Sequence, residues 1–376
     1  MALDISVRPV STRGELNAFI KLPWKLYVGD PHWVPPLIFD VKNKLSKKHN
    51  HFFEHGDAEY FIAWKGSEPV GRITAQYDYN YDKHWGGATG QFGWFEAIDD
   101  QAVADALFGT AADWLRAKKR DTMQGPYNFN INDECGLLVE GFDTPPMMMM
   151  IHNLPYYQSL YEGFGMKKAQ DLYAYWMDTT VDPPEDVALY AERIRSNPDI
   201  VIRNWDKKRH ADEMDRWLDV YNSAWEKNWG SVLMNEKEFK AHALELRLFA
   251  DPDLIFVAET KAGEVMGLAF TLPNINEYLI HLNGHIYNLL PTLWYNMIVK
   301  KSYKSCRVVT LGVKEHFRKS GIGAVFYHDT LMAVKRKGYE WGEMSWILES
   351  NDAMNRAIQH MGGEVYKTYR VYEAAI

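Results

Sequence analysis

The stretch that decides the fold runs from residue 307 to residue 338 and reads RVVTLGVKEHFRKSGIGAVFYHDTLMAVKRKG. Its first seven residues are rich in β-branched side chains and predict a strand. Apolar residues then recur at helical spacing, and three basic residues before Gly338 are typical of the end of a helix. The junction between the strand and the helix contains Arg318, Lys319, Ser320, Gly321, Ile322 and Gly323.

This junction predicts a binding site for an anion. Glycines at 321 and 323 let backbone N–H groups approach a phosphate, and the helix N-terminus adds positive potential. Arg318 and Lys319 add charge. On these residues alone, a tight strand-to-helix turn without a ligand is an equally good interpretation. The junction has neither the G-K-[ST] of a Walker loop nor the G-x-G-x-x-G of a Rossmann fingerprint.

Outward from this stretch, the chain contains two similar hairpins. Residues 60–76 read YFIAWKGSEPVGRITAQ, and residues 255–271 read IFVAETKAGEVMGLAFT. Each combines a β-branched strand, a short charged turn and a second strand. Matching Gly71 to Gly267 gives an offset of 267 − 71 = 196 residues, about half of the chain. The same order of a strand, two helices, three strands, a helix, a strand, a helix and a strand is predicted around each hairpin.

A length of 376 residues with 47% hydrophobic residues also predicts two domains, each with its own core. We expect a first domain over residues 1–178 and a second over residues 199–376. Between them, residues 179–198 contain the pair Pro183-Pro184 and continue with a polar helical pattern, which predicts a linker that contains one helix.

The composition argues against several classes of protein. The chain has 42 basic and 50 acidic residues and a net charge of −8, so it lacks the basic surface of a dedicated nucleic-acid binder. No run reaches the roughly 18 apolar residues of a membrane span, and the first residues do not resemble a signal peptide. Two cysteines in a chain of this length are typical of a reducing compartment. We therefore expect a cytoplasmic protein without a nucleic-acid partner.

The pattern V-x-x-x-x-R-x-x-G-x-G, from Val313 to Gly323, resembles the signature of the GNAT superfamily of acyl-CoA-dependent N-acyltransferases. The spacing of Asn351 and Gly362 is similar to that of a helix that follows in this superfamily. The resemblance covers residues 199–376 by motif and residues 3–178 by the order of elements alone. It implies an α/β (α+β) fold of two tandem GNAT-like domains, each a mixed, mostly antiparallel twisted sheet flanked by helices.

The resemblance implies an N-acyltransferase without a metal. It would move an acyl group from acetyl-CoA or another acyl-CoA to an amine that attacks the thioester directly. The backbone from Arg318 to Gly323 would cradle the pyrophosphate. The strand end at Leu311 and Val313 would pair with the pantetheine arm, where an amide would polarise the thioester carbonyl, and Asn351 would touch this arm. The acceptor would be a small-molecule amine or an amino-acid-like compound, and a homodimer is compatible with the sequence.

The first half departs from this pattern. At the position of the phosphate loop, residues 95–101 read FEAIDDQ, with no glycine pair and with Asp99 and Asp100 at the start of a helix. Carboxylates cap a helix N-terminus well but repel a pyrophosphate. We therefore expect one CoA site per chain. The first half is then a scaffold, a substrate wall or a dimerisation surface.

The reaction needs a base for the amine and a proton donor for the thiolate. Many members of the superfamily carry a Tyr donor at the position that Ile358 fills here. Glu343 is the candidate base and His360 the candidate acid, although a strand carboxylate without a catalytic role is the competing interpretation of Glu343. Because the Tyr is missing, a non-catalytic acyl-CoA-binding sensor or scaffold is the alternative to an enzyme. Further candidates are Glu349 as base, and Tyr366 and Ser350 as donors.

Residues 273–302 form a long apolar and aromatic insertion after the second hairpin, interrupted by Gly284 and Pro291. One interpretation is a lid or channel for an acceptor or acyl chain larger than those of acetyl transfer. The other is a surface that packs on the first half or on a second subunit. His281 and His285 lie four residues apart in it, and we interpret them as surface histidines because no third ligand accompanies them.

Residues 128–146 are rich in turn formers and predict a long loop. Its polar side chains at Asn128, Asn130, Asn132 and Glu134 are candidates for contact with the acceptor. The four methionines that follow at 147–150 are interpreted either as adaptable pocket lining or as core filling.

Overall fold

The computed structural model describes residues 4–376, and these form two compact units. Within the described chain, unit 1 comprises residues 4–172, 278–289 and 367–376, and unit 2 comprises residues 173–277 and 290–366. The strands β9 (Lys167–Asp178) and β15 (Glu364–Ala375) each run from one unit into the other. The boundaries that we expect at residues 178 and 199 follow the order of elements along the chain and stay a prediction, whereas the compact units are assembled from separate segments.

Unit 1 is built on a sheet with the strand order β1, β2, β3, β4, β5 and the end of β15, to which β8 also pairs. Its strands are antiparallel except for β4 and β5, which run parallel. The strands are β1 (Ile5–Pro9), β2 (Gly56–Lys65), β3 (Glu68–Asp78), β4 (Thr89–Ala97), β5 (Thr122–Gly125), β6 (Tyr127–Asn128), β7 (Glu134–Cys135) and β8 (Leu137–Glu140). The helices are α1 (Arg13–Lys21), α2 (Pro23–Leu26), α3 (Ile38–Lys44), η1 (His51–Glu54), α4 (Tyr79–Trp85), α5 (Gln101–Ala117), α6 (Tyr157–Gly163) and η4 (Ile286–Asn288).

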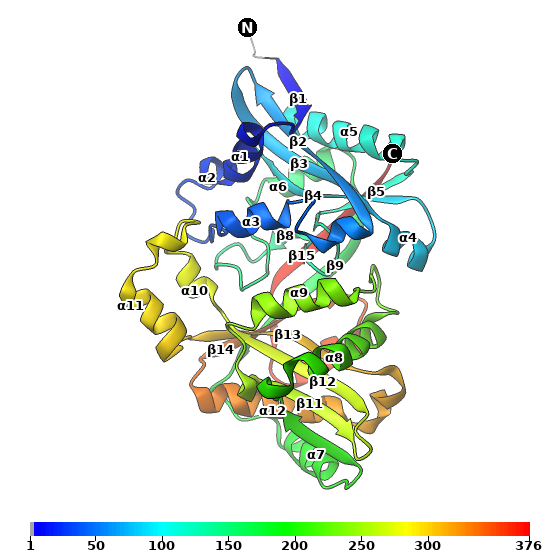
Figure 1. The fold of residues 1–376 in the computed structure, drawn as a ribbon, viewed down its shortest axis with the longest axis vertical. Coiled ribbons are helices and arrows are strands. Elements are labelled where there is room, and N and C mark those ends of the chain that lie inside the picture. The colour runs from blue at the N-terminus through cyan, green and yellow to red at the C-terminus, as the bar shows by residue number, and fades with distance from the viewer. Residues whose placement is uncertain (1–3) are drawn as a thin grey trace. The chain divides into compact units, whose positions relative to one another are not determined.

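The core of unit 1 lies between this sheet and α5, which packs along β3 (Figure 1). The helix buries Val103, Leu107 and Leu115 completely, at the spacing of one helical face. Gly71 on β3 allows this close approach, because a Cβ there would lie 2.7 Å from the Leu107 side chain. At its N-terminus, the Asp100 carboxylate accepts from Ala102 N at 2.9 Å, which confirms the expected cap.

Unit 2 repeats this arrangement with the strand order β10, β11, β12, β13 and β14. Its strands are again antiparallel, except for the parallel pair β13 and β14. The strands are β10 (Ile200–Asn204), β11 (Ile255–Thr260), β12 (Val265–Pro273), β13 (Ser305–Val313) and β14 (Trp341–Leu348). The helices are α7 (Glu185–Arg195), η2 (Lys207–Arg209), α8 (His210–Trp225), α9 (Glu236–Leu246), η3 (Pro252–Leu254), α11 (Pro291–Trp294), the π-helix η5 (Tyr295–Lys300), η6 (Glu315–Ser320), α12 (Ile322–Lys337) and α13 (Asp352–His360). A further short helix, α10, spans Asn276–Leu279.

Strand registers confirm the predicted duplication. Gly71 pairs with Ala97 at the end of β4, and Gly267 pairs with Val313 at the end of β13. In unit 2 the helix over Gly267 is α12 (orange in Figure 1), whose Phe326 ring would lie 3.1 Å from a Cβ on Gly267. The copies differ in their additions, because unit 1 inserts α3, η1, α4 and β6 to β8 into the expected order. None of the described helices is long and apolar enough to span a bilayer.

Candidate active site

The parallel strands β13 and β14 diverge. Their pairing runs only from Ser305 opposite Trp341 to Val308 opposite Met344, although β13 continues to Val313 and β14 to Leu348. The register between β12 and β13 also shifts at this point, where Val309 is skipped. A bulge of this kind bends a strand and re-aims its backbone groups. Leu311 and Val313 therefore lie where β13 is held by β12 but has left β14.

The junction after β13 is the segment that we expect to hold phosphate, and its backbone can be compared with that expectation. Gly321 is left-handed, with φ of 84°, and α12 begins at the next residue. N–H groups in the first turn of a helix lack the usual partner four residues back, and here Ala324 N donates instead to Gly321 O at 3.1 Å. At Gly323, no other atom lies within 4 Å of the position that a Cβ would take, so this turn is open. The residues therefore fit the pyrophosphate of an acyl-CoA.

The side chains of the junction have different surroundings. Ile322 is completely buried and can contribute only its backbone, and Ser320 Oγ accepts from Ile322 N at 3.4 Å. Lys319 is exposed. The Arg318 guanidinium donates from Nη2 to the backbone oxygen of Ala224 at 3.0 Å, which fixes the arginine against the end of α8. These contacts position the loop while leaving charge at its surface.

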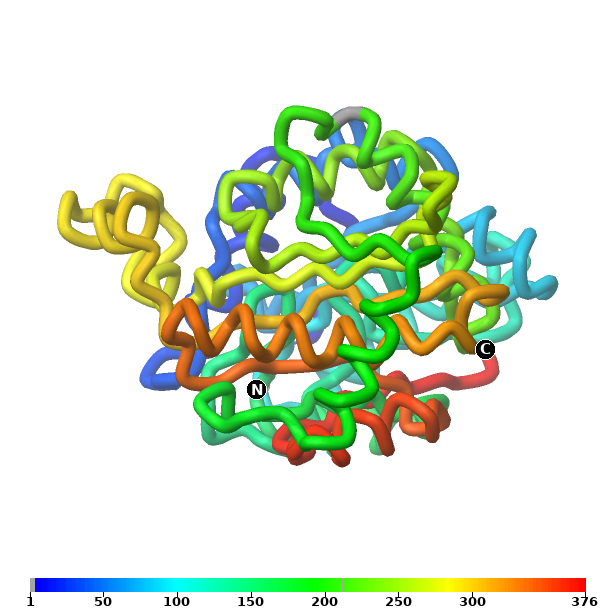
Figure 2. The backbone as a smooth tube through the Cα atoms, turned by 90° about the horizontal axis from the view of Figure 1, so that it is seen from below, coloured from blue at the N-terminus to red at the C-terminus, as the bar shows by residue number. Residues whose placement is uncertain are grey.

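The linker helix α7 packs on this loop, a contact that the sequence did not predict. Helices α7 (green) and α12 (orange) lie against each other in unit 2 (Figure 2). A Cβ on Gly321 would come within 2.7 Å of the Tyr190 hydroxyl and 2.9 Å of Ile194. Both its φ angle and its neighbours therefore require glycine at 321.

Glu343 lies in a buried cluster at the base of the diverging strands. It stands opposite Arg307 in the parallel register, and Glu343 Oε1 lies 3.4 Å from Arg307 Nε. At most 1% of either side chain is exposed. Arg307 Nε also donates to Ser345 Oγ at 2.7 Å, and the Tyr366 hydroxyl donates to Glu343 Oε2. The guanidinium compensates the charge of a carboxylate that would otherwise be costly to bury.

His360 lies apart from this cluster, at the surface. Its side chain is 55% exposed, and its Nε2 lies 2.8 Å from the Asp186 carboxylate of α7. The hydrogen bond from His360 lowers the pKa of Asp186. The histidine thus fastens α13 to α7, and its role as an acid stays a prediction.

Asn351 is the N-cap of α13, where its side chain accepts from Met354 N at 3.2 Å. Ile358, at the position where the resemblance would place a Tyr donor, is completely buried. Asn355, which no motif of the sequence singles out, donates to the backbone oxygens of Leu348 and Glu349 and accepts from the Tyr175 hydroxyl at 2.8 Å. In the sequence, Asn355 is marked only by its position one helical turn after Asn351. This position alone does not reveal its partner, Tyr175 on β9.

In unit 1 the corresponding divergence is filled by the chain itself. Strands β4 and β5 pair only from Thr89 to Gln91, and the segment at Tyr127–Asn128 then follows β4. Asn128 Oδ1 accepts from Trp94 N at 2.8 Å, and Gln76 Nε2 donates to the backbone oxygens of Tyr127 and Phe129. A Cβ on Gly93 would overlap the Tyr127 carbonyl. In unit 1, residues 127 and 128 therefore lie beside β4 where its pairing with β5 has ended, which is the position that we expect to hold a pantetheine arm in unit 2.

The other polar residues of this loop also have internal partners. Asn128 Nδ2 donates to Glu134 at 3.0 Å, and Asn130 Oδ1 accepts from Asn132 N at 2.9 Å. Met147, Met148 and Met150 are buried. These side chains stabilise unit 1, and their contact with an acceptor stays a prediction.

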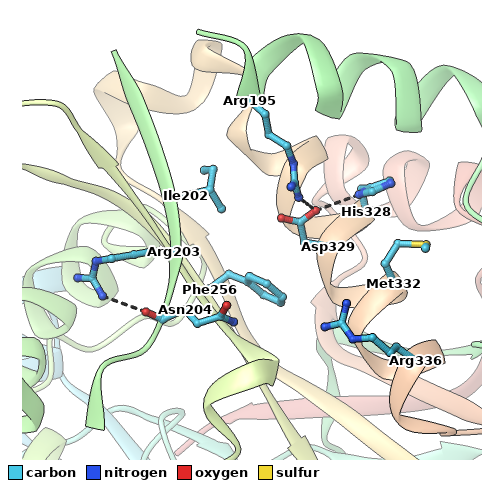
Figure 3. A pocket seen from close by; sticks show the side chains of 9 residues that line it. All are labelled: Arg195, Ile202, Arg203, Asn204, Phe256, His328, Asp329, Met332 and Arg336. Atoms are coloured by element: carbon cyan, nitrogen blue, oxygen red, sulfur yellow. Dashed lines mark hydrogen bonds and ion pairs between the residues drawn. The ribbon is translucent and has the colours of Figure 1, made fainter. Parts of the chain in front are cut away.

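A second feature of unit 2 is a cavity of about 350 Å³ bounded by β10, β11, α7 and α12 (Figure 3). Asp329 at its wall pairs with Arg195, and His328 Nδ1 lies 2.9 Å from the same carboxylate. Burial, together with the charge of Arg195, lowers the pKa of His328. None of the residues expected to bind CoA lines this cavity, which is lined by Arg195, Ile202, Arg203, Asn204, Phe256, His328, Asp329, Met332 and Arg336.

Metal ligation has no structural support within residues 4–376, where no three His, Cys, Asp or Glu side chains are grouped as ligands. His285 stacks on Tyr287 with ring centroids 4.7 Å apart. Cys135 and Cys306 are both buried and do not form a disulfide. Burial raises the pKa of the Cys306 thiol well above its usual value, so this cysteine is a poor nucleophile.

Comparisons with known proteins agree with this geometry. The chain is 40% identical over 381 residues to the bacterial ceramide synthase of Caulobacter vibrioides, covering 99% of this chain and 98% of that protein. It is 38% identical over 377 residues to protein YghO of Escherichia coli, with coverage of 98% and 95%. No protein-family profile matches the chain.

Two solved structures share the fold along the whole chain. A tandem GNAT protein from the clavulanic acid biosynthesis pathway superposes with a TM-score of 0.57 at 12% identity, covering 99% of this chain and 98% of that one. A GCN5-related N-acetyltransferase from Sphaerobacter thermophilus gives 0.55 at 11% identity, with coverage of 99% and 95%. The chain therefore belongs to the family of the bacterial ceramide synthase and YghO, as an acyltransferase with a tandem GNAT fold.

Proposed function

We propose that the protein is an acyl-CoA-dependent N-acyltransferase that forms the amide bond of a ceramide-like lipid. Its acceptor would be a long-chain amino alcohol, and its donor an acyl-CoA with a long acyl chain. The observation that carries this proposal is the 40% identity, over nearly the full length of both chains, to a protein named bacterial ceramide synthase. The apolar insertion after β12 is consistent with substrates larger than those of acetyl transfer.

The acyl-CoA would bind in unit 2. The N–H groups around Gly321 and Gly323 would hold the pyrophosphate, and Arg318 and Lys319 would add positive charge. The pantetheine arm would pair with β13 beyond Val308, where β14 no longer does. We assign one such site to each chain, because the equivalent space in unit 1 is occupied by the segment around Asn128.

The cluster below this site supplies a route for the proton. The amine nitrogen attacks the thioester carbonyl carbon, a C–N bond forms, and the C–S bond breaks to release the CoA thiolate. The proton of the amine passes to the Tyr366 oxygen while the Tyr366 proton passes to Glu343. Glu343 then returns the proton through Tyr366 to the thiolate or to water. Arg307 orients the carboxylate for this exchange.

A direct assay tests the proposal. Purified protein is mixed with palmitoyl-CoA or acetyl-CoA and with sphinganine or a short amine, while released thiol and amide product are measured. We expect thiol release and amide formation with palmitoyl-CoA and sphinganine, and much less with the short substrates. Equal turnover of acetyl-CoA and a short amine would refute the lipid substrates.

The non-catalytic alternative, an acyl-CoA-binding sensor or scaffold, rests on Ile358 at the usual position of the Tyr donor. It would show itself as tight binding of palmitoyl-CoA without thiol release, whichever amine is offered. Tyr366→Phe serves as the matched control, because it removes one hydroxyl from the proton route and leaves the phosphate junction unchanged.

A further inference from the structure

A helical segment of unit 2, formed by α11 and η5, presents large apolar side chains to solvent. Exposed fractions are 63% for Leu290, 48% for Trp294, 52% for Tyr295 and 54% for Val299. Four large apolar side chains that are exposed within ten residues are typical of a surface for interaction. Figures 1 and 2 show the segment projecting from the strands of unit 2.

The projection is held in place by defined contacts. Its base is closed by Glu277, whose carboxylate accepts from Lys304 N at 3.0 Å and from Ser305 N at 2.8 Å. Just after the C-terminal end of η5, Ser302 N donates to Asn296 O at 3.0 Å. The Tyr303 hydroxyl donates to the backbone oxygen of Met297, a buried residue of η5. These hydrogen bonds therefore fix the position of the segment, while its large apolar side chains stay exposed to solvent.

The charged side chains of the segment itself are all basic, and one of them, Lys304, also lies 3.9 Å from the Glu340 carboxylate. The chain contains 50 Asp and Glu residues, yet none occurs in the 37 residues from Tyr278 to Lys314. Lys300, Lys301 and Lys304 follow the apolar residues directly, and all three are exposed. An apolar face bordered by lysines is complementary to a surface that combines hydrocarbon with negative charge, which is the composition of an anionic lipid interface.

We propose that the segment from Leu290 to Lys304 docks the protein on anionic phospholipid membranes. The side chains of Leu290, Trp294, Tyr295 and Val299 enter the boundary between headgroups and acyl chains, and the lysines contact lipid phosphates. A second copy of the chain or a protein partner would also cover the apolar residues. Neither explains why a chain with a net charge of −8 excludes acidic residues from this stretch. The inference goes beyond acyl transfer and does not depend on it.

Vesicle sedimentation tests the proposal with the full chain. We expect binding to vesicles of phosphatidylcholine mixed with phosphatidylglycerol, and weak binding to pure phosphatidylcholine. Lys300→Glu/Lys301→Glu should reduce the partition coefficient by about fivefold or more for each lysine removed, and high salt should reduce wild-type binding similarly. Trp294→Ser/Val299→Ser should reduce it by about tenfold or more, because it removes buried apolar area.

Matched controls change the same kinds of residue elsewhere in unit 2. Leu244 is 64% exposed on α9, and Lys261 is exposed between β11 and β12. Leu244→Ser and Lys261→Glu should bind vesicles as the wild type does. Equal losses in controls and test variants would overturn the proposal, as would failure of the wild type to bind anionic vesicles.

A probe at the apolar face gives a second readout. Cys135 and Cys306 are buried, so an environment-sensitive fluorophore will react preferentially with an introduced Leu290→Cys. We expect the emission maximum of this probe to shift to the blue when anionic vesicles are added. A probe at Leu244→Cys should show no such shift. A dimer that dissociates in Trp294→Ser/Val299→Ser, with unchanged vesicle binding, would assign the face to a second copy and overturn the membrane proposal.

Discussion

Arg307 and Glu343 stand opposite each other on parallel strands, with Nε and Oε1 3.4 Å apart and at most 1% of either side chain exposed. Replacing one partner leaves the other charge buried alone. We predict that Arg307→Met lowers the free energy of unfolding by about 3–5 kcal/mol, measured in urea. The double variant Arg307→Met/Glu343→Met should recover much of this loss. A loss below about 1 kcal/mol in the single variant would show that Glu343 does not need its partner.

Tyr366 and Glu343 should affect turnover rather than acyl-CoA binding. We predict that Tyr366→Phe and Glu343→Gln each lower kcat by about 10²- to 10⁴-fold, the usual range for loss of a general acid or base. The Kd for palmitoyl-CoA, measured by calorimetry, should stay within a few-fold of wild type. His360→Gln is the comparison, because His360 pairs with Asp186 at the surface and should leave kcat nearly unchanged. If His360→Gln lowered kcat and Tyr366→Phe did not, the general acid would be His360 on α13.

Gly323 offers a cleaner probe of the phosphate junction than Gly321. Any side chain at position 321 would require an unfavourable left-handed backbone and would clash with Tyr190. A loss of acyl-CoA binding in such a variant would therefore partly reflect strain. Gly323 has open space, and we predict that Gly323→Glu weakens acyl-CoA binding by at least about 100-fold, because it places a carboxylate beside the pyrophosphate. Gly323→Ala should keep the thermal stability of the wild type. Unchanged affinity of Gly323→Glu for acyl-CoA would show that the junction does not bind the pyrophosphate.

One acyl-CoA should bind per chain. In unit 1, Trp94 N donates to Asn128 Oδ1 at 2.8 Å, and this bond anchors the segment that fills the divergence of β4 and β5. Asn128→Ala should cost about 1–3 kcal/mol, because it leaves a buried backbone N–H without a partner. Calorimetric titration with palmitoyl-CoA should give a stoichiometry of one for the wild type. A stoichiometry of two would place a second site in unit 1.

The duplication and the glycine junction could be predicted because both rest on local pattern. Hairpins, their 196-residue offset and a strand–loop–helix segment can be identified from residue types alone. The partner of Glu343 could not, because Arg307 becomes its neighbour only through the register of two parallel strands that are far apart in sequence. The contact of Tyr190 with the phosphate junction also depends on tertiary packing. The sequence identified α7 as a linker helix, and only the structure shows which surface it covers.

Acid should weaken unit 1 through Asp171. Burial alone would raise the pKa of Asp171, but hydrogen bonds from Arg370 at 2.7 and 3.0 Å and from Lys168 at 2.9 Å lower it. A carboxyl with a lowered pKa stabilises the fold above its usual pKa of about 4, and this contribution disappears as the pH falls through the lowered value. We predict that Asp171→Asn is destabilised at pH 7 and that the difference from wild type shrinks below about pH 4.

Urea unfolding at several pH values measures this effect. Asp113→Asn is a suitable control, because Asp113 lies on α5 with 77% of its side chain exposed. Its difference from wild type should be small at every pH. A constant difference for Asp171→Asn across the range would contradict an ionic role for Asp171.

Because the end of β15 belongs to unit 1, it determines the order in which the two units can be completed during synthesis. Residues 367–376 belong to unit 1, where Tyr372 pairs with Gly125 of β5 and is almost completely buried. These residues are synthesised after every residue of unit 2, so the sheet that contains β1 cannot be completed before unit 2 has been made. Removal of residues 367–376 would therefore damage the sheet that contains the first strand, β1, rather than unit 2.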